Sequence, residues 1–182
     1  MEQINYNEYD NIINWVPDAI IDLKYYSSDN FTGQTVYDRE YSQLRVGTLK
    51  KLQKAANLLR KQGYKLVIWD AFRPIGAQKI FWDIFPNEQF VAPKISKHNR
   101  GCAVDVSLAN LDGQLLEMPS KFDDFTEKAS NSTELLIEPI KSRLQELQYA
   151  MIRAGFELYS DEWWHFIDSN WLFYEADCNK EE

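Results

Sequence analysis

Two histidines are the residues of this chain best suited to bind a metal ion, and each lies near a carboxylate. His98 and Asp105 stand on either side of a turn at Gly101, and Asp105 lies between Val104 and Val106 in an apolar strand pattern. An ionised Asp in a buried strand is costly unless it is paired, and a metal ion is a suitable partner. The spacing alone is a weak signal, because Asp also points outward from half-buried strands.

The only other histidine strengthens this interpretation. His165 follows Asp161 and Glu162 in a second apolar run, so both histidines of the sequence lie beside carboxylates. His98, Asp105 and His165 offer two nitrogens and one carboxylate, the ligand count of a catalytic zinc site that keeps its fourth position for water. The sequence therefore predicts one Zn²⁺ per chain. It contains no H-E-x-x-H motif, which excludes a thermolysin-like arrangement.

Glu162 and Arg73 are the candidates for catalysis. Glu162 precedes His165 by three residues, close enough to act as the general base that takes a proton from the attacking water. Arg73 lies where a strand gives way to a helix, and its permanent charge suits an oxyanion formed when water attacks a carbonyl. Two alternatives stay open: Glu162 as an exposed loop acid beside Asp161, and Arg73 as a surface residue at a helix start.

Composition limits the classes of protein and partner. The chain has 182 residues, 45% of them hydrophobic, and no low-complexity linker, which predicts one domain over residues 1–182. A net charge of −8 without a basic stripe argues against nucleic acid or an anionic membrane as partner, and favours a small molecule or peptide. The absence of a signal-like N-terminus or a long apolar run indicates a cytoplasmic protein. The sequence does not indicate an oligomeric state.

The two cysteines do not form a disulfide framework. Cys102 and Cys178 are too few for one, and Cys102 lies within an apolar strand pattern, as a small core residue would. We expect both thiols to be reduced.

The first half of the chain contains strand and helix patterns in mixed order. Residues 19–25 are typical of an early strand, and Thr48 is expected to cap a helix that ends at Gly63. Residues 65–70 form a short buried strand. A second helix then begins at Pro74 and is expected to turn one apolar face inward, made by Ala77, Ile80, Phe81 and Ile84.

The second half adds a hairpin, a helix and a last strand. The strand around Asp105 is expected to turn at residues 110–113 and return antiparallel over residues 114–118. The longest helix is expected to run from near Pro139 to Gly155, before a strand over residues 163–167. Because strands and helices do not alternate regularly, the sequence predicts an α+β fold with a small central antiparallel sheet flanked by helices.

Four motifs in order resemble one enzyme family. They are Asp29-Asn30-Phe31-Thr32-Gly33, Trp69-Asp70-Ala71-Phe72-Arg73-Pro74, Ser96-x-His98-x6-Asp105 and Glu162-Trp163-Trp164-His165. Together they are similar to the VanX-type D-alanyl-D-alanine dipeptidases, zinc peptidases related to D,D-carboxypeptidases and to the hedgehog N-terminal fold. The similarity runs from about Tyr25 to His165.

The resemblance implies the fold and hydrolysis of D-Ala-D-Ala or a close dipeptide. It implies zinc ligands at His98, Asp105 and His165, a base at Glu162 and transition-state stabilisation by Arg73. It also implies substrate contacts from Tyr25, Ser96 and Asp123, with Tyr25 and Asp123 at the free ammonium group. A carboxylate binds an ammonium group by charge-assisted hydrogen bonds, so the role of Asp123 has physical support. Tyr25 as a core residue and Asp123 as an ordinary loop acid remain alternatives.

Several positions depart from the family pattern. Phe72 and Phe166 stand where a tyrosine is usual, Met118 is followed by Pro119 where the family tends to carry glycine, and the stretch over residues 73–98 is shorter. We expect altered pocket walls with the catalytic set intact, and room for substrates longer than a dipeptide. The alternative functions are therefore a D,D-carboxypeptidase acting on longer peptidoglycan stem peptides, or an inactive zinc-stabilised binding module.

Overall fold

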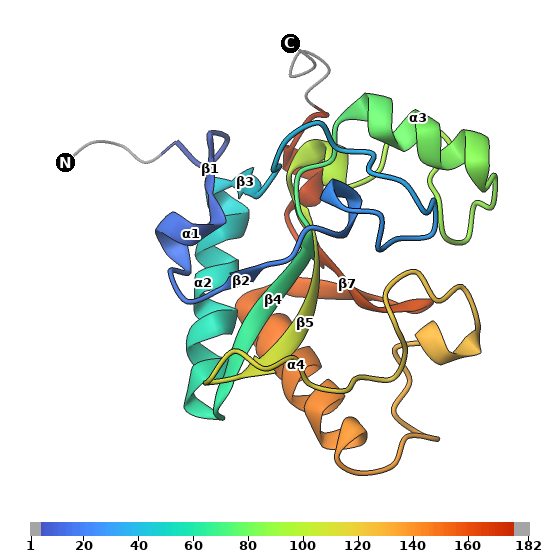
Figure 1. Ribbon diagram of the computed structural model, residues 1–182. Helices are drawn as coiled ribbons and strands as arrows, with labels where there is room; N and C mark the ends of the chain where they lie inside the picture. The colour runs from blue at the N-terminus through green and yellow to red at the C-terminus, as the bar shows by residue number, and fades with distance from the viewer. Residues whose placement is uncertain (1–4, 177–182) are drawn as a thin grey trace.

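The centre of the molecule is a five-stranded sheet in the order β2-β4-β5-β7-β6 (Figure 1). The computed structural model describes residues 5–176. Neighbouring strands of the large sheet are antiparallel, except that β2 runs parallel to β4. Strands β1 and β3 form a separate antiparallel pair. The strands are β1 (Tyr9–Asn11), β2 (Ile20–Ile21), β3 (Gln43–Arg45), β4 (Tyr64–Asp70), β5 (Ala103–Asn110), β6 (Phe156–Tyr159) and β7 (Glu162–Asp168).

Two long helices cover one face of this sheet. Helices α2 and α4 lie side by side beneath it, whereas α3 lies apart at the other end of the strands (Figure 1). The helices are α1 (Ile12–Trp15), α2 (Val46–Lys61), α3 (Ile75–Ile84) and α4 (Ile140–Ala154). Short 3₁₀ helices cover Lys24–Tyr26, His98–Arg100, Glu127–Ala129 and Trp171–Phe173.

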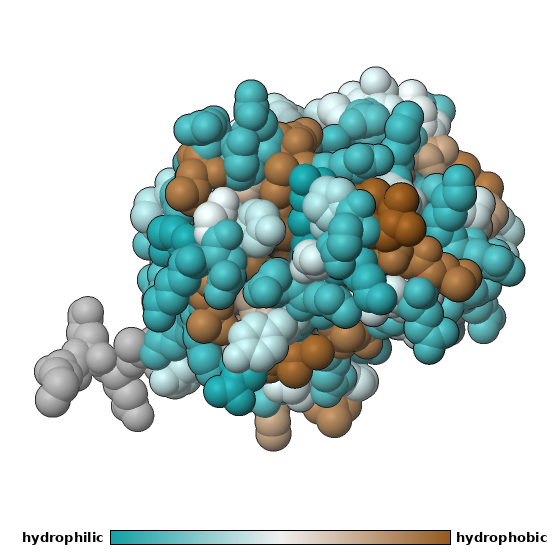
Figure 2. All heavy atoms as spheres, turned by 90° about the horizontal axis from the view of Figure 1, so that it is seen from below, coloured by the Kyte–Doolittle hydropathy of each residue, from teal (hydrophilic) through white to brown (hydrophobic). Residues whose placement is uncertain are grey.

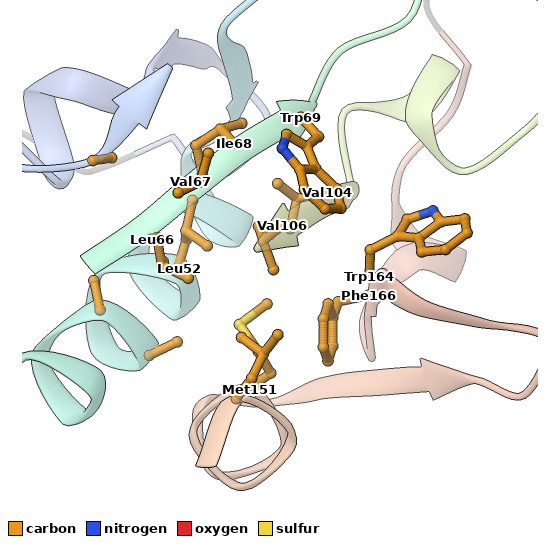
Figure 3. Packing of buried hydrophobic residues seen from close by; sticks show 14 of the residues in the cluster. Leu52, Leu66, Val67, Ile68, Trp69, Val104, Val106, Met151, Trp164 and Phe166 are labelled. Atoms are coloured by element: carbon orange, nitrogen blue, oxygen red, sulfur yellow. The ribbon is translucent and has the colours of Figure 1, made fainter. Parts of the chain in front are cut away.

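The main core lies between the sheet and these two helices. Val104 and Val106 point from β5 toward Leu52 of α2 and Met151 of α4 (Figure 3). All four side chains are fully buried. Because side chains alternate across a strand, Asp105 is directed to the opposite face. The alternation thus separates an apolar face under the helices from a face that can carry chemistry.

A second buried cluster is mostly aromatic and surrounds α3. Tyr25, Phe72 and Phe81 belong to it, together with Ala77 and Val91. The Tyr25 and Phe81 rings lie 4.4 Å apart between centroids. This cluster packs the start of the chain against α3, beside the site described below.

Most of the expected elements are confirmed. The fold is α+β, with an early helix ending before Gly63, a buried strand at residues 64–70 and a helix ending before Gly155. Gly155 has a φ of 107°, a left-handed backbone conformation that favours glycine after a helix. The expected return of the hairpin is reduced to one bridge, between Ala109 and Leu115.

Several details of the prediction were wrong. Residues 19–25 contribute only a two-residue strand, because the chain then turns into a 3₁₀ helix that buries Tyr25. Helix α2 begins at Val46, so Thr48 is not its cap; its hydroxyl donates to Asp168 instead. Helix α2 has 16 residues and α4 has 15, so α4 is not the longest. The pairing of β2 with β4 is parallel, so the sheet is not wholly antiparallel.

The inward face of α3 also differs from the prediction. Ile80 and Ile84 are 44% and 47% exposed, while Gln78 is buried beside Ala77 and Phe81. The helix is short and packs through one narrow stripe, so only part of its apolar pattern is covered.

Cys102 is a free, buried thiol immediately before β5 rather than within it. Burial raises the pKa of its thiol to about 12, so it remains protonated. Cys178 lies outside the described residues. Across residues 5–176, no helix is both long enough and apolar enough to cross a bilayer.

Candidate metal centre

The three predicted ligands converge. Asp105 on β5 lies directly opposite His165 on β7 in the antiparallel register, and His98 comes from the 3₁₀ helix before β5. Asp105 Oδ1 lies 2.8 Å from His165 Nδ1 and 3.3 Å from His98 Nε2, and the two imidazole nitrogens are 3.1 Å apart. Their ligating atoms all lie within 4.8 Å of one another. One ion can contact all three.

The turn between His98 and Asp105 requires its glycine. Gly101 has a φ of 66°, and a Cβ there would lie 2.3 Å from the Tyr9 ring. A larger residue would therefore be strained and would displace the ring. Gly101 thus allows the chain to pass from His98 into β5 within a few residues.

The surroundings of both imidazoles favour an unprotonated ring nitrogen that can bind a metal ion. His98 Nδ1 lies 2.8 Å from the carbonyl oxygen of Ala71, to which it donates, so its Nε2 carries the lone pair that faces the site. Burial lowers the pKa of His165, which favours its neutral, metal-binding form. Both histidines therefore suit a divalent ion.

Arg73 is buried and held by an ion pair. Its Nε and Nη2 donate to Asp70 Oδ2 at 3.0 and 2.7 Å, and Asp70 is fully buried. Tyr37 OH also donates to Asp70 Oδ1, at 2.6 Å. Burial alone would lower the pKa of the Arg73 guanidinium, but Asp70 together with the neighbouring Tyr37, Tyr25 and Asp105 outweighs burial, and the pKa is raised. Arg73 is therefore not the surface residue of the alternative interpretation.

Glu162 shares a cavity with the ligands. This cavity, of about 220 Å³, is lined by Glu162 and Arg73 as well as by His98, Asp105 and His165. Burial, followed by repulsion from Asp105 and Asp123, raises the pKa of Glu162 well above its usual value. A carboxylate whose pKa is raised accepts a proton more readily, which suits a general base. Its position excludes the exposed loop acid.

The three expected substrate contacts line the same cavity: Tyr25, Ser96 and Asp123. Tyr25 OH donates to Asp123 Oδ1, and the Phe31 amide donates to Oδ2, both at 3.0 Å. Burial raises the pKa of Asp123 to about 7 despite these bonds. Asp123 has a φ of 56°, in the left-handed region. Tyr25 is 3% exposed, so it belongs both to the core and to the cavity.

Three buried polar residues around this set had no role in the sequence analysis. Asp70 orients Arg73, and Gln78 accepts a hydrogen bond from it. Asn99 donates to the Arg73 carbonyl at 2.7 Å and accepts from the Ser96 amide at 2.7 Å. Asp70 ends a buried strand three residues before Arg73, and this spacing could have predicted an ion pair between them. Gln78 and Asn99 have no comparable pattern around them.

Comparison with known proteins identifies the family of this chain. Residues 5–177 match the family described as D-ala-D-ala dipeptidase. A D-alanyl-D-alanine dipeptidase of Escherichia coli is 36% identical over 153 residues, covering 82% of this chain and 79% of the relative. One from Enterococcus faecium is 35% identical over 171 residues, covering 80% and 84%. The solved LdcB LD-carboxypeptidase, at 18% identity, covers 73% of this chain and 63% of its own with a TM-score of 0.49. The chain belongs to the D-Ala-D-Ala dipeptidase family of metallopeptidases.

Proposed function

We propose that this protein is a zinc-dependent dipeptidase that hydrolyses D-Ala-D-Ala, or a closely related dipeptide, to free amino acids. The observation that carries the proposal is the convergence of His98, Asp105 and His165 on one cavity that also contains Glu162 and Arg73. Family membership supports the substrate class. A purely structural metal site would need neither a carboxyl group nor a buried guanidinium lining its cavity.

The donor set fits one zinc ion per chain. Two imidazole nitrogens and one carboxylate are the ligands of a catalytic zinc site, and three protein ligands leave a position for solvent or substrate. When bound, the ion would lower the pKa of water and polarise the scissile carbonyl. The hydrogen bond from His98 Nδ1 to Ala71 serves this set by fixing the tautomer that His98 presents.

Glu162 acts as the general base. Its carboxylate takes a proton from the attacking water and passes it to the nitrogen of the leaving amino acid as the peptide bond breaks. Its raised pKa supports the first step, because a carboxylate with a higher pKa takes a proton more readily.

Arg73 stabilises the oxyanion. The negative charge that grows on the carbonyl oxygen is met by a guanidinium that Asp70 already holds in place, so little reorganisation accompanies the reaction. The aromatic faces of Tyr25 and Phe81 lie 5.4 and 4.9 Å from the guanidinium carbon and limit its movement.

Asp123 and Tyr25 bind the substrate ammonium group. An ammonium group beside the partly buried Asp123 carboxyl pairs with its charged form and lowers the pKa of the carboxyl on binding. The Tyr25 hydroxyl orients the carboxylate. Ser96, beside His98, is the further substrate contact, held by Asn99.

The test combines metal analysis with substrate choice. The purified protein should contain about one zinc per chain, lose hydrolysis of free D-Ala-D-Ala on chelation and regain it with zinc. N-acetyl-D-Ala-D-Ala should be a poor substrate, because it has no ammonium for Asp123. Equal hydrolysis of both compounds would favour the carboxypeptidase alternative, and loss of neither activity on chelation would contradict the proposal.

A further inference from the structure

One buried amide connects the catalytic arginine to the segment that covers the cavity. This covering segment, residues 85–97, joins α3 to the 3₁₀ helix of His98, and its residues 88–92 line the cavity. Gln78, on α3, is 1% exposed. Its Oε1 accepts from Arg73 Nη1 at 2.9 Å, while its Nε2 donates to the Ala92 carbonyl at 2.7 Å.

The two hydrogen bonds fix the orientation of this side chain. An amide buried in an apolar stripe is costly unless both ends are paired, and Leu or Met would otherwise suit a position between Ala77 and Phe81. Here Arg73 satisfies the acceptor and Ala92 the donor. Reversing the amide would leave both bonds unmade, so the position of Ala92 defines which end of Gln78 faces Arg73.

Gln78 also contacts the part of the guanidinium that Asp70 does not hold. Asp70 binds the Nε and Nη2 edge through one oxygen, whereas Gln78 binds Nη1. Phe81, on the same helix face as Gln78, lies 4.9 Å from the guanidinium carbon. Helix α3 therefore supplies both a polar and an aromatic contact to Arg73.

We infer that Gln78 is a positioning residue, which aligns Arg73 for the reaction and couples this alignment to the position of the covering segment. The inference rests on the proposed function, in which Arg73 meets the oxyanion. A displacement of Ala92 would pull the Gln78 amide and release Nη1. A misalignment of a catalytic group by about 1 Å lowers the rate by roughly 100-fold.

A double-mutant cycle tests the coupling to Arg73. Gln78→Met keeps the length of the side chain and removes both bonds, and should lower kcat roughly 10- to 100-fold with little change in KM, because the oxyanion exists only in the transition state. In an Arg73→Lys background, which has no Nη1, the same substitution should cost less than about twofold. Equal losses in the two backgrounds would overturn the inference.

A second variant separates the two bonds. Beside the guanidinium, the carboxylate of Gln78→Glu stays ionised, so it keeps the bond to Arg73 and loses the bond to Ala92. This variant should retain kcat within about tenfold of the parent enzyme, above the Gln78→Met value. A loss as large as that of Gln78→Met would assign the effect to the covering segment alone and overturn the role at Arg73.

A matched control and a readout without turnover complete the test. Gln148, on α4, donates to the Asn131 carbonyl at 2.6 Å, away from the cavity, so Gln148→Met should leave kcat unchanged. In NMR spectra of isotope-labelled protein, the Nη1 protons of Arg73 should be resolved in the parent and in Gln78→Glu, and averaged in Gln78→Met. Identical Arg73 signals in all three would contradict the inference even if the parent hydrolysed no dipeptide.

Discussion

The two faces of the central sheet differ in the kinds of side chain that they bury. The face under α2 and α4 buries aliphatic and aromatic side chains such as Leu52, Val104 and Phe166 (Figure 3). The other face buries ionisable groups, among them Asp70 and Asp105. Burial stabilises the first group and opposes the charged form of the second. The difference indicates that the helix-covered face provides stability while the ionisable face holds a site that a ligand completes.

The outer surface seen from below does not show this contrast. Hydrophilic residues cover much of the molecule seen from below, interrupted by apolar patches (Figure 2). Scattered apolar residues are usual on protein surfaces. The distinction between the faces therefore lies inside the molecule, and substitutions of buried residues are the way to test it.

The largest expected effect is on catalysis. Glu162→Gln removes the proton acceptor and should lower kcat by about 10³- to 10⁴-fold, while zinc content stays near that of the parent. Without metal, this variant should unfold at the same urea concentration as the metal-free parent or at a higher one. The substitution removes a carboxyl group whose raised pKa shows that folding opposes its charged form. Kinetics, metal analysis and urea unfolding measure the three quantities. A variant with near-native turnover would remove Glu162 from the mechanism.

In the core between the sheet and helices α2 and α4, we expect a substitution to lower stability and to leave catalysis unchanged. Leu52 is fully buried, so Leu52→Ala should lower the free energy of unfolding by about 2–5 kcal/mol through lost burial and a new cavity. The kcat and KM of the folded fraction should stay close to those of the parent at 25 °C. Urea unfolding and initial rates test this. A large change in KM would show that the two faces are coupled.

A smaller effect is expected at Asp123, the proposed contact of the substrate ammonium group. Asp123→Asn removes the charge and keeps one acceptor oxygen, which can face the Phe31 amide while the new NH2 group donates to the Tyr25 hydroxyl. KM for the free dipeptide should therefore rise about 10- to 100-fold with a smaller change in kcat. Initial rates over a range of substrate concentrations measure this change. An unchanged KM would indicate that the ammonium is held elsewhere.

The same substitution has a pH signature in the metal-free protein. The pKa of Asp123 is about 7 in the folded state against an ordinary value of 3.8, so the folded state binds its proton more tightly. Its contribution to stability is complete below about pH 4 and is lost as the pH rises through about 7. Asp123→Asn should lose less stability than the parent across this interval, as measured by urea unfolding at each pH. Parallel curves would contradict the assigned shift.

The sequence predicted the apolar elements and the chemical set for different physical reasons. The stripe of α4 and the buried strand around Ile68 follow from periodicity, because side-chain direction is set by the helix or strand repeat. The proposed metal ligands were predicted from their chemistry, since His98 and His165 are the only histidines. Their distances required the pairing of β5 with β7, which connects residues 60 positions apart.

The roles of several buried polar residues could not be predicted, because they depend on contacts between segments that are distant in the sequence. Asp70 and Gln78 act on Arg73 only because the chain folds a strand end, a helix and a covering segment around one guanidinium. Thr48 was expected to cap a helix, yet it pairs with Asp168, which is 120 residues away. No local pattern encodes such partners.

The smallest expected effect concerns the misjudged face of α3. Its apolar spacing predicted that Ile80 would be buried, but the side chain is 44% exposed, while Gln78 occupies the interior. Ile80→Lys should therefore change the free energy of unfolding by less than about 0.5 kcal/mol, as is usual for surface substitutions. For comparison, Phe81→Ala, at a 1% exposed position one residue later, should lower the free energy of unfolding by about 3–5 kcal/mol. Urea unfolding of the two variants measures both values, and a loss above about 2 kcal/mol for Ile80→Lys would restore the face expected from the spacing alone.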